Sequence, residues 1–159
     1  MENRYFDDEW FMDAALKMAE KAYSKGEVPV GAVVVNQEGK IISEGHNLKE
    51  SNFDPTGHAE IIAIKKAAAE ISSWRLSGCT IYVTLEPCLM CLASMTQSRV
   101  DRVVFGAFDP KGGAFSLGYH FNKDKRLNHK FKVSGGLLHY KCSKVLSNFF
   151  KERRKGHKK

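Results

Sequence analysis

Residues 8–25 carry apolar side chains at every third or fourth position, and Gly26 ends this run. That periodicity predicts an amphipathic helix with one face turned toward a core. Two further apolar segments, VGAVVVN (30–36) and KIISEGH (40–46), flank the turn residues 37–39. Two short β-prone runs around a glycine-containing turn predict a β-hairpin.

Beyond a polar connection at 47–57, the pattern alternates between helix and strand. Runs rich in Ala and straight-chain residues predict helices, and runs rich in β-branched residues predict buried strands. Residues 108–130 hold several Gly, Lys, Asn and Asp residues and predict a long loop of the kind that is usually functional or mobile. Such alternation is typical of an α/β fold in which helices cover a sheet. We expect helices over 58–71, 88–98 and 144–154, and strands over 79–85 and 100–107.

The composition is that of one soluble globular domain. The chain has 159 residues, of which 43% are hydrophobic and 27% are charged. No apolar run approaches the roughly 20 residues that span a bilayer, so we expect no membrane association. The acidic start MENRYFDDEW lacks the basic region and apolar core of a secretory signal, which predicts a cytoplasmic protein. In that reducing compartment we expect Cys79 and Cys142, which stand singly among apolar residues, to be buried core thiols.

Positive charge is concentrated at the C-terminal end. Of the net charge of +7, the last nine residues, KERRKGHKK, contribute +5, because they hold six Lys or Arg and one Glu. The remainder of the chain therefore carries only +2. We predict a basic C-terminal helix or tail at about 144–159 of a single domain spanning 1–159. This segment is either a solvated terminus or an arm that binds nucleic-acid phosphates.

One imidazole and two thiols stand at metal-ligand spacing. His58 and Glu60 begin a predicted helix, and Cys88 and Cys91 follow Pro87 after a predicted strand. Structural zinc sites usually close with four protein ligands, whereas hydrolytic sites keep one position for water. Three ligands with a carboxylate beside them therefore indicate a zinc site that activates water.

The spacing gives these residues different tasks. One helical turn brings Cys88 and Cys91 to the same side, and a helix N-terminus favours thiolate over thiol. His58 and Glu60 are two residues apart and cannot share a helix face, so we expect Glu60 to approach the water from another direction. It could take the proton of the water, deliver it to a ring nitrogen and then help to protonate departing ammonia. Together these steps amount to hydrolytic deamination.

Taken singly, each residue also has a simpler explanation. A histidine at a helix start is often a cap or a core residue, and a glutamate in a first turn often pairs with the helix dipole. A C-x-x-C pair can be half of a four-ligand structural zinc site or a redox pair. An RNA-binding module with a structural zinc would need a fourth protein ligand, for which Cys79 or another histidine is the candidate.

The pattern H-x-E…P-C-x-x-C is the known signature of zinc nucleobase deaminases. With its surroundings, it resembles the bacterial tRNA-specific adenosine deaminases of the cytidine deaminase-like superfamily. The resemblance covers about residues 8 to 155, and the TLEPC to VFGAFD stretch and the FF-x-x-RR end point to the tRNA branch. The matching segments are EVPVGAVVV (27–35), GHN (45–47), DPTGHAEIIAI (54–64), TIYVTLEPCLMC (80–91), SRVDRVVFGAFD (98–109), LNH (127–129) and SNFFKERRK (147–155).

The resemblance implies deamination of adenosine to inosine at the wobble position of a tRNA anticodon, with the anticodon stem-loop as partner. It also implies a homodimer, and an α/β three-layer sandwich in which helices flank a central mixed five-stranded sheet. Transferred by position, one Zn²⁺ per subunit would be held by His58, Cys88 and Cys91, and Glu60 would be the catalytic acid/base.

The resemblance also implies a substrate pocket. Asn47 would contact the target nucleoside, and an amide side chain can both donate to and accept from a purine or a ribose. Val30 and Leu85 would form apolar walls around the base. The backbone N–H of Ala59 would be a donor within the pocket.

RNA contacts are expected from two further segments. Asp109 could accept a hydrogen bond from a ribose 2′-OH, or it could be an ordinary turn aspartate before Pro110. Phe149 and Phe150 could stack an extruded anticodon base, but adjacent helix residues face different ways, so one ring is expected to stack and the other to pack in the core. We assign Phe149 to the substrate. The candidates for phosphate contacts are Lys111, Arg153 and Arg154.

The chain departs from the family pattern after the second zinc segment. Phe115 stands where a small residue is expected in relatives, and residues 118–126 match poorly, so the resemblance says least about anticodon contacts there. A competing interpretation is a small-molecule deaminase that acts on guanine, cytosine or a free nucleoside. Such an enzyme would share the zinc core and would not need a basic terminal arm.

Overall fold

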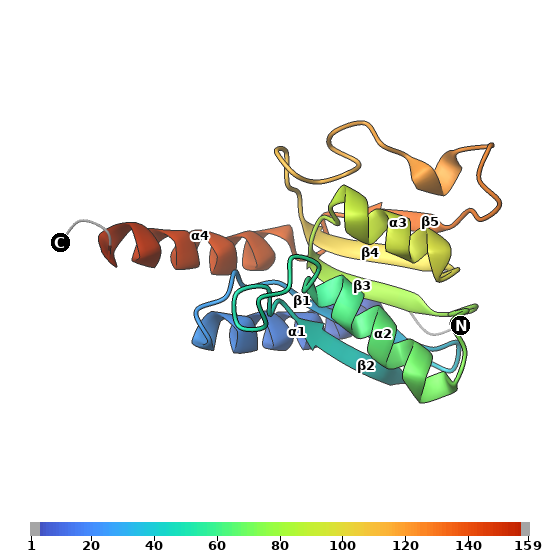
Figure 1. The fold of residues 1–159 in the computed structure, drawn as a ribbon, viewed down its shortest axis with the longest axis horizontal. Helices are drawn as coiled ribbons and strands as arrows, with labels where there is room; N and C mark the ends of the chain where they lie inside the picture. The colour runs from blue at the N-terminus through green and yellow to red at the C-terminus, as the bar shows by residue number, and fades with distance from the viewer. Residues whose placement is uncertain (1–3, 157–159) are drawn as a thin grey trace.

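A five-stranded sheet lies between two layers of helices (Figure 1). The computed structural model describes residues 4–156, with side chains from residue 8 onward. The strands are β1 (Gly31–Val35), β2 (Ile41–His46), β3 (Thr80–Leu85), β4 (Arg102–Ala107) and β5 (Lys132–Gly135). The helices are α1 (Arg4–Ser24), α2 (Ala59–Ile71), α3 (Leu89–Gln97) and α4 (His139–Gly156), with a 3₁₀ turn, η1 (Phe121–Lys123), in the last long loop.

The sheet is mixed and has the strand order β2-β1-β3-β4-β5. Strand β1 is antiparallel to both β2 and β3, which confirms the predicted hairpin. Strands β3, β4 and β5 are parallel, and α3 forms the crossover between the first two. The predicted three-layer sandwich with a mixed five-stranded sheet is therefore confirmed.

Side chains of the central strands alternate between two cores. Val34 of β1 packs with residues of α2 and α3 on one face, whereas Val33 and Val35 pack with residues of α1 and α4 on the other. Every residue of β1 is buried. A strand covered on both faces reads as a continuous apolar run rather than an alternating one, which is the pattern seen in GAVVV.

Helix α2 lies close to the sheet at Gly45 of β2. A Cβ atom on Gly45 would lie 2.5 Å from the carbonyl oxygen of Ala59, the first residue of α2. The missing side chain therefore lets the first turn of α2 pack directly on the hairpin. This contact fixes the position of the helix start that carries His58 and Glu60.

The sequence patterns locate most elements but not all of their ends. Helices α2 and α3 begin and end within one residue of the predicted bounds. Helix α4 begins at His139, five residues before its predicted start, and α1 begins before residue 8. Strand β5 was not recognised from its pattern, because its four residues, KVSG, are mostly exposed and carry no apolar alternation.

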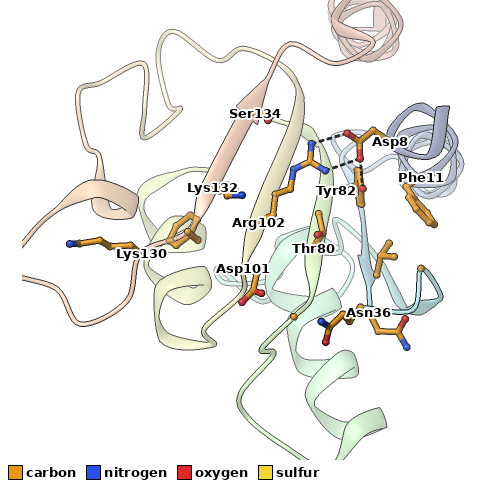
Figure 2. Close-up of a pocket in the computed structure, with 15 residues that line it drawn as sticks. Asp8, Phe11, Asn36, Thr80, Tyr82, Asp101, Arg102, Lys130, Lys132 and Ser134 are labelled. Atoms are coloured by element: carbon orange, nitrogen blue, oxygen red, sulfur yellow. Dashed lines mark hydrogen bonds and ion pairs between the residues drawn. The ribbon is translucent and has the colours of Figure 1, made fainter. Parts of the chain in front are cut away.

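An open hollow of about 930 Å³ lies beside the N-terminal part of α1, at the ends of β3 and β4 where these strands begin (Figure 2). There the carboxylate of Asp8 accepts two hydrogen bonds from the Arg102 guanidinium, at 2.8 and 2.7 Å, and one from the Tyr82 hydroxyl, at 2.6 Å. This arrangement ties α1 to β3 and β4. None of the predicted site residues lines this hollow.

The remaining cysteines agree with the expectation from composition. Cys79 and Cys142 are buried thiols without a disulfide partner. No helix within residues 4–156 combines the length and hydrophobicity needed to cross a bilayer.

Candidate active site

Three ligand atoms from two helix starts converge at one point. The Nδ1 atom of His58 lies 3.6 Å from the Sγ atoms of both Cys88 and Cys91, and the three atoms all lie within 4.8 Å of one another. A tetrahedral zinc about 2.0–2.1 Å from nitrogen and about 2.3 Å from sulfur separates these donors by about 3.6 Å. The donor set and its spacing therefore fit Zn²⁺.

The two helix starts supply metal ligands rather than caps. His58 and Cys88 occupy the N-cap positions of α2 and α3, and neither side chain makes a cap hydrogen bond. The interpretation of His58 as a capping residue is therefore wrong. Both helix N-termini direct their positive ends at the cluster, which favours thiolates there.

Hydrogen bonding within the cluster also favours a thiolate. A bond from the Cys91 thiol, together with one from His58, lowers the pKa of Cys88 to about 4, while the same Cys88–Cys91 interaction raises the pKa of Cys91. The hydrogen bond to Cys88 raises the pKa of His58. Because a divalent cation binds the deprotonated forms, metal binding would release the protons that these groups hold.

Glu60 lies in the first turn of α2 and is 4% exposed. Burial raises the pKa of its carboxyl group, and a hydrogen bond with Cys91 opposes that shift. Glu60 therefore reaches the same cluster as His58 while remaining outside the set of ligand atoms that converge on the metal position. This position suits a proton carrier.

A pocket of about 230 Å³ opens over the cluster. Its volume is below the roughly 300–1,000 Å³ of sites for drug-sized ligands, so it suits one flat ring rather than a whole nucleotide. All predicted substrate residues except Phe149 line it. The lining consists of Val28, Val30, Asn47, Lys49, His58, Ala59, Glu60, Leu85, Glu86, Cys88, Asp109 and Gly112.

Asn47 is buried, and its side chain is held by two hydrogen bonds. Its Nδ2 donates to the carbonyl of Val28 at 3.2 Å, and its Oδ1 accepts from the N–H of Lys49 at 3.1 Å. An amide group has two donor hydrogens and two acceptor lone pairs. One donor and one acceptor therefore remain for a ligand, and the two internal bonds fix their direction.

Ala59 and the apolar residues complete the pocket. Ala59 is the first residue of α2, so its N–H has no acceptor within the helix and can serve a ligand. Val30 is buried and Leu85 is half-buried, and both line the pocket, as does Val28, which sequence reasoning missed.

Asp109 is a turn aspartate, the simpler of the two roles considered for it, and it also lines the pocket. Its Oδ1 accepts hydrogen bonds from the N–H groups of Lys111 and Gly112, at 3.2 and 3.1 Å. The carboxylate thus shapes the loop that follows β4. The side chain of Lys111 is exposed outside the pocket.

The assignment of Phe149 to substrate stacking needs correction. Phe149 is 4% exposed and packs edge-on against Tyr23 of α1, with ring centres 5.5 Å apart. Phe150, on the next position of α4, is 45% exposed. The two rings do divide between core and surface as expected, but Phe150 is the one that a base could reach.

The basic residues of α4 differ in their contacts with the rest of the protein. The Arg153 guanidinium donates to the carbonyl of Gly26 at 2.9 Å and lies 4.9 Å from the centre of the Phe149 ring. It therefore fastens α4 to the end of α1. Arg154 is exposed, and the residues of the basic tail after Gly156 lie outside the described residues.

Two buried glutamates in the neighbourhood were missed as site residues. Glu27 accepts hydrogen bonds from the backbone N–H groups of Glu50 and Ser51, and so holds the loop between Asn47 and His58. Glu86 accepts bonds from the loop after β4. An acidic residue between apolar segments was the one sequence feature that could have indicated these two sites. The partners of each glutamate lie more than twenty positions away in the sequence, so the pattern does not show what it binds.

A fourth protein ligand is absent from the part of the chain that the structure describes. His58, Cys88 and Cys91 form the one group of three or more potential ligands there. Cys79 precedes β3, whereas Cys88 follows it, and a strand of six residues spans about 20 Å. The arrangement therefore does not support the four-ligand structural site.

Comparison with known proteins agrees with this geometry. The family model for the cytidine and deoxycytidylate deaminase zinc-binding region matches residues 6–107. The chain is 49% identical over 147 residues to a tRNA-specific adenosine deaminase of Haemophilus influenzae, covering 92% of this chain and 85% of that protein. It is 48% identical over 148 residues to the tRNA-specific adenosine deaminase of Bacillus subtilis, covering 93% and 91%.

A solved structure is similar as well. It comes from a study of A-to-I editing by tRNA:A34 deaminases at the wobble position of transfer RNA. The TM-score is 0.81 with 40% sequence identity, and the match covers 86% of this chain and 98% of the other. The similarity therefore extends over both helical layers and the sheet.

Proposed function

Because the chain belongs to the tRNA-specific adenosine deaminases, within the family defined by the cytidine and deoxycytidylate deaminase zinc-binding region, we propose that it converts adenosine to inosine at the wobble position of a tRNA anticodon. The observation that carries the proposal is the convergence of His58, Cys88 and Cys91, with the buried carboxyl of Glu60 beside them, at the floor of a base-sized pocket.

In this reaction water adds to the amino-bearing ring carbon and ammonia leaves, so that adenosine and water give inosine and ammonia. His58, Cys88 and Cys91 would hold Zn²⁺, which when bound would supply the Lewis acid that makes water a nucleophile. Glu60 takes one proton of the attacking water and transfers it to a ring nitrogen. It then takes the remaining proton of the added hydroxyl and delivers it to the departing amino group, so that ammonia leaves as the carbonyl forms. Its burial keeps bulk water from competing for that proton.

The pocket residues would orient the base for this chemistry. Val30 and Leu85 would supply apolar walls for the flat ring, and Asn47 presents one donor and one acceptor in fixed directions. The N–H of Ala59 adds a donor beside the metal position. Holding the reacting carbon within a near-attack distance converts a bimolecular step into an effectively unimolecular one.

The RNA partner would be bound by the surface around the pocket. Lys49 lines the opening, Lys111 lies on the loop after β4, and Arg154 lies on the far part of α4, which projects from the body of the protein (Figure 1). The exposed ring of Phe150 offers a stacking surface for a base next to the target. Asp109 would accept from a ribose 2′-OH, which would favour RNA over DNA.

We also propose a cellular location, a domain organisation and an oligomeric state for the enzyme. We place it in the cytoplasm, where a reducing environment keeps Cys88 and Cys91 available as thiolates. We take residues 1–159 as one deaminase domain, since residues of α1, α2, α3 and α4 all pack in the cores on the two faces of the same sheet. The family resemblance adds a homodimer, which sedimentation of the purified protein would test.

The direct test is inosine mapping in total tRNA treated with the purified, zinc-loaded protein. Inosine at a wobble adenosine supports the proposal. The competing small-molecule interpretation is tested in parallel by incubation with free guanine, cytosine and nucleosides. Conversion of one of these with the RNA left unmodified would replace the proposed function.

Removing charge from α4 should weaken RNA binding in a salt-dependent way. We expect the double substitution R154A/K155A to reduce affinity for an anticodon stem-loop and to lower the slope of log K against log salt by about 1.4, since each phosphate contact on a single strand contributes about 0.7. Arg153 is kept because it anchors α4 to Gly26. The measurement is fluorescence anisotropy over a range of salt concentrations.

The control for this experiment is K130A/K132A, which removes the same charge at the opposite end of the sheet, beside the hollow of Figure 2. That variant should leave the slope unchanged. Equal slopes for wild type and R154A/K155A would mean that the end of α4 is only a solvated terminus.

A further inference from the structure

Glu86 stands between Leu85, a wall of the pocket, and Pro87-Cys88, where the metal-binding helix begins. Its side chain is 2% exposed. A carboxylate taken out of water is costly unless it accepts hydrogen bonds or meets a positive charge. Among the described residues, its partners are neutral hydrogen-bond donors rather than a Lys or Arg, and they all come from one segment of the chain.

That segment is the loop Asp109–Ser116, which follows β4. The N–H of Asp109 donates to Oε1 of Glu86 at 3.0 Å, and the N–H of Ser116 donates to Oε2 at 2.8 Å. The Ser116 hydroxyl adds a third bond, to Oε1, at 2.5 Å. Glu86 therefore holds both ends of the loop at once: Oε1 accepts from Asp109 and Ser116, and Oε2 accepts from Ser116.

The middle of the same loop packs directly against the Glu86 carboxylate. A Cβ atom on Gly113 would lie 2.2 Å from the carboxyl carbon of Glu86, so no side chain fits at this position while Glu86 stays in place. The N–H of Ala114 donates to the carbonyl of Pro87 at 2.9 Å, which adds a backbone link beside the carboxylate. The glycine and the hydrogen bonds are separate observations that indicate the same contact.

The loop held in this way forms one side of the pocket. Asp109 and Gly112 line the pocket together with Glu86. The width of the pocket on this side is therefore set by where Glu86 holds the two loop ends. Glu27 holds the loop between Asn47 and His58 through Glu50 and Ser51 in a comparable manner.

We propose that Glu86 is a positioning residue that sets substrate affinity, by fixing the Asp109–Ser116 loop against the strand end that leads into the metal site. The inference rests on the proposed function for its choice of substrate. Glu86 does not transfer protons in the reaction: its oxygens are occupied by three donors from the loop, and Glu60 is the carboxyl at the metal cluster.

The first test is Glu86→Gln, which keeps the shape and turns one acceptor into an N–H₂ group that faces a loop N–H. Leaving such a donor unsatisfied is expected to raise KM for the anticodon stem-loop about tenfold or more. Zinc content, kcat within about threefold and the pH profile of kcat should stay as in the wild type. Amide hydrogen exchange at Asp109 and Ser116 should accelerate, and exchange in β3 should not.

The matched control is Glu38→Gln, the same substitution on an exposed glutamate in the hairpin turn, which should change none of these quantities. A second variant, Gly113→Ala, leaves Glu86 intact and displaces its carboxylate. We expect it to reproduce the rise in KM, and we expect the double variant to show less than the product of the two effects, because both disrupt one contact.

Several outcomes would overturn the inference. Unchanged KM and unchanged exchange at Asp109 and Ser116 in E86Q would show that the bonds do not hold the loop. A loss of kcat at constant KM, or a shifted pH profile, would place Glu86 in the chemistry. If E86Q loses zinc or unfolds, a folded Gly113→Ala with wild-type KM contradicts the proposal. Hydrogen exchange needs no substrate, so it tests the contact between Glu86 and the loop even if the wild-type protein edits no RNA. Absence of editing by the wild type would reject the proposed function and not this contact.

Discussion

Replacing Glu60 with Gln is expected to lower kcat for adenosine deamination by about 10²–10⁴-fold, the range for removal of a positioned acid/base. The variant should keep its zinc and its fold. Glu60 is buried but lies outside the convergent donor set, and Gln fills the same space without the ionisable group. Single-turnover kinetics on an anticodon stem-loop, with zinc measured by atomic absorption, would show the two effects separately.

A matched control for this prediction lies on the same helix. Glu70 is exposed near the end of α2, so Glu70→Gln changes the same chemical group without touching the pocket and should retain wild-type kcat. Full activity in the Glu60→Gln variant would remove Glu60 from the mechanism. Loss of zinc from that variant would instead make the carboxylate a metal ligand.

Replacing Cys91 with Ser is expected to reduce zinc affinity by more than the roughly 10–100-fold typical of losing an outer-shell partner, and to abolish editing. Cys91 is fully buried in α3, and its Sγ is one of three convergent donors. With only His58 and Cys88 left, the cluster cannot fix the ion. Titration against a chromophoric zinc chelator gives the affinity, and thermal unfolding with and without zinc gives the loss of stabilisation.

Cys79→Ser is the control for this substitution. Cys79 is also a buried thiol, but it precedes β3 and lies at the other end of that strand from the cluster. The Cys79→Ser variant should bind one zinc with wild-type affinity and edit RNA normally. Zinc loss in the Cys79 variant would revive the four-ligand structural interpretation, and undiminished zinc affinity in the Cys91 variant would refute the proposed ligand set.

Sequence patterns identified the elements that bury a continuous or periodic apolar face. Strand β1 is of this kind because its residues pack on both faces of the sheet, and helix α2 is of this kind because its apolar face packs on one of them. Strand β5 escaped recognition because it lies at an edge and three of its four residues are exposed or glycine. The start of α4 was placed too late because exposed residues such as Tyr140 and Lys141 carry little hydrophobic signal.

The metal cluster could be predicted because its chemistry is visible in residue types and short spacings. His58, Cys88 and Cys91 meet as the motif indicated. The supports of the pocket could not be found in this way. Glu27 and Glu86 act through backbone N–H groups of distant loops, and a backbone donor leaves no mark in the sequence. The choice between Phe149 and Phe150 likewise depends on the rotation of α4 against α1.

The divergent residue Phe115 turns toward the core rather than toward the substrate pocket. Its ring stacks on Phe105 of β4 with centres 5.8 Å apart and planes at 10°. It does not line the pocket. The departure from the family pattern at this position therefore changes the packing beneath the loop after β4 and leaves the pocket walls in place.

The most direct test of the account is a crystal structure of the zinc-loaded protein. We expect Nδ1 of His58 and the Sγ atoms of Cys88 and Cys91 as the three protein donors, and a fourth donor from solvent within about 2.6–3.2 Å of the Glu60 carboxylate. A fourth protein side chain on the metal, or Glu60 turned away from the solvent ligand when a substrate analogue is bound, would contradict it.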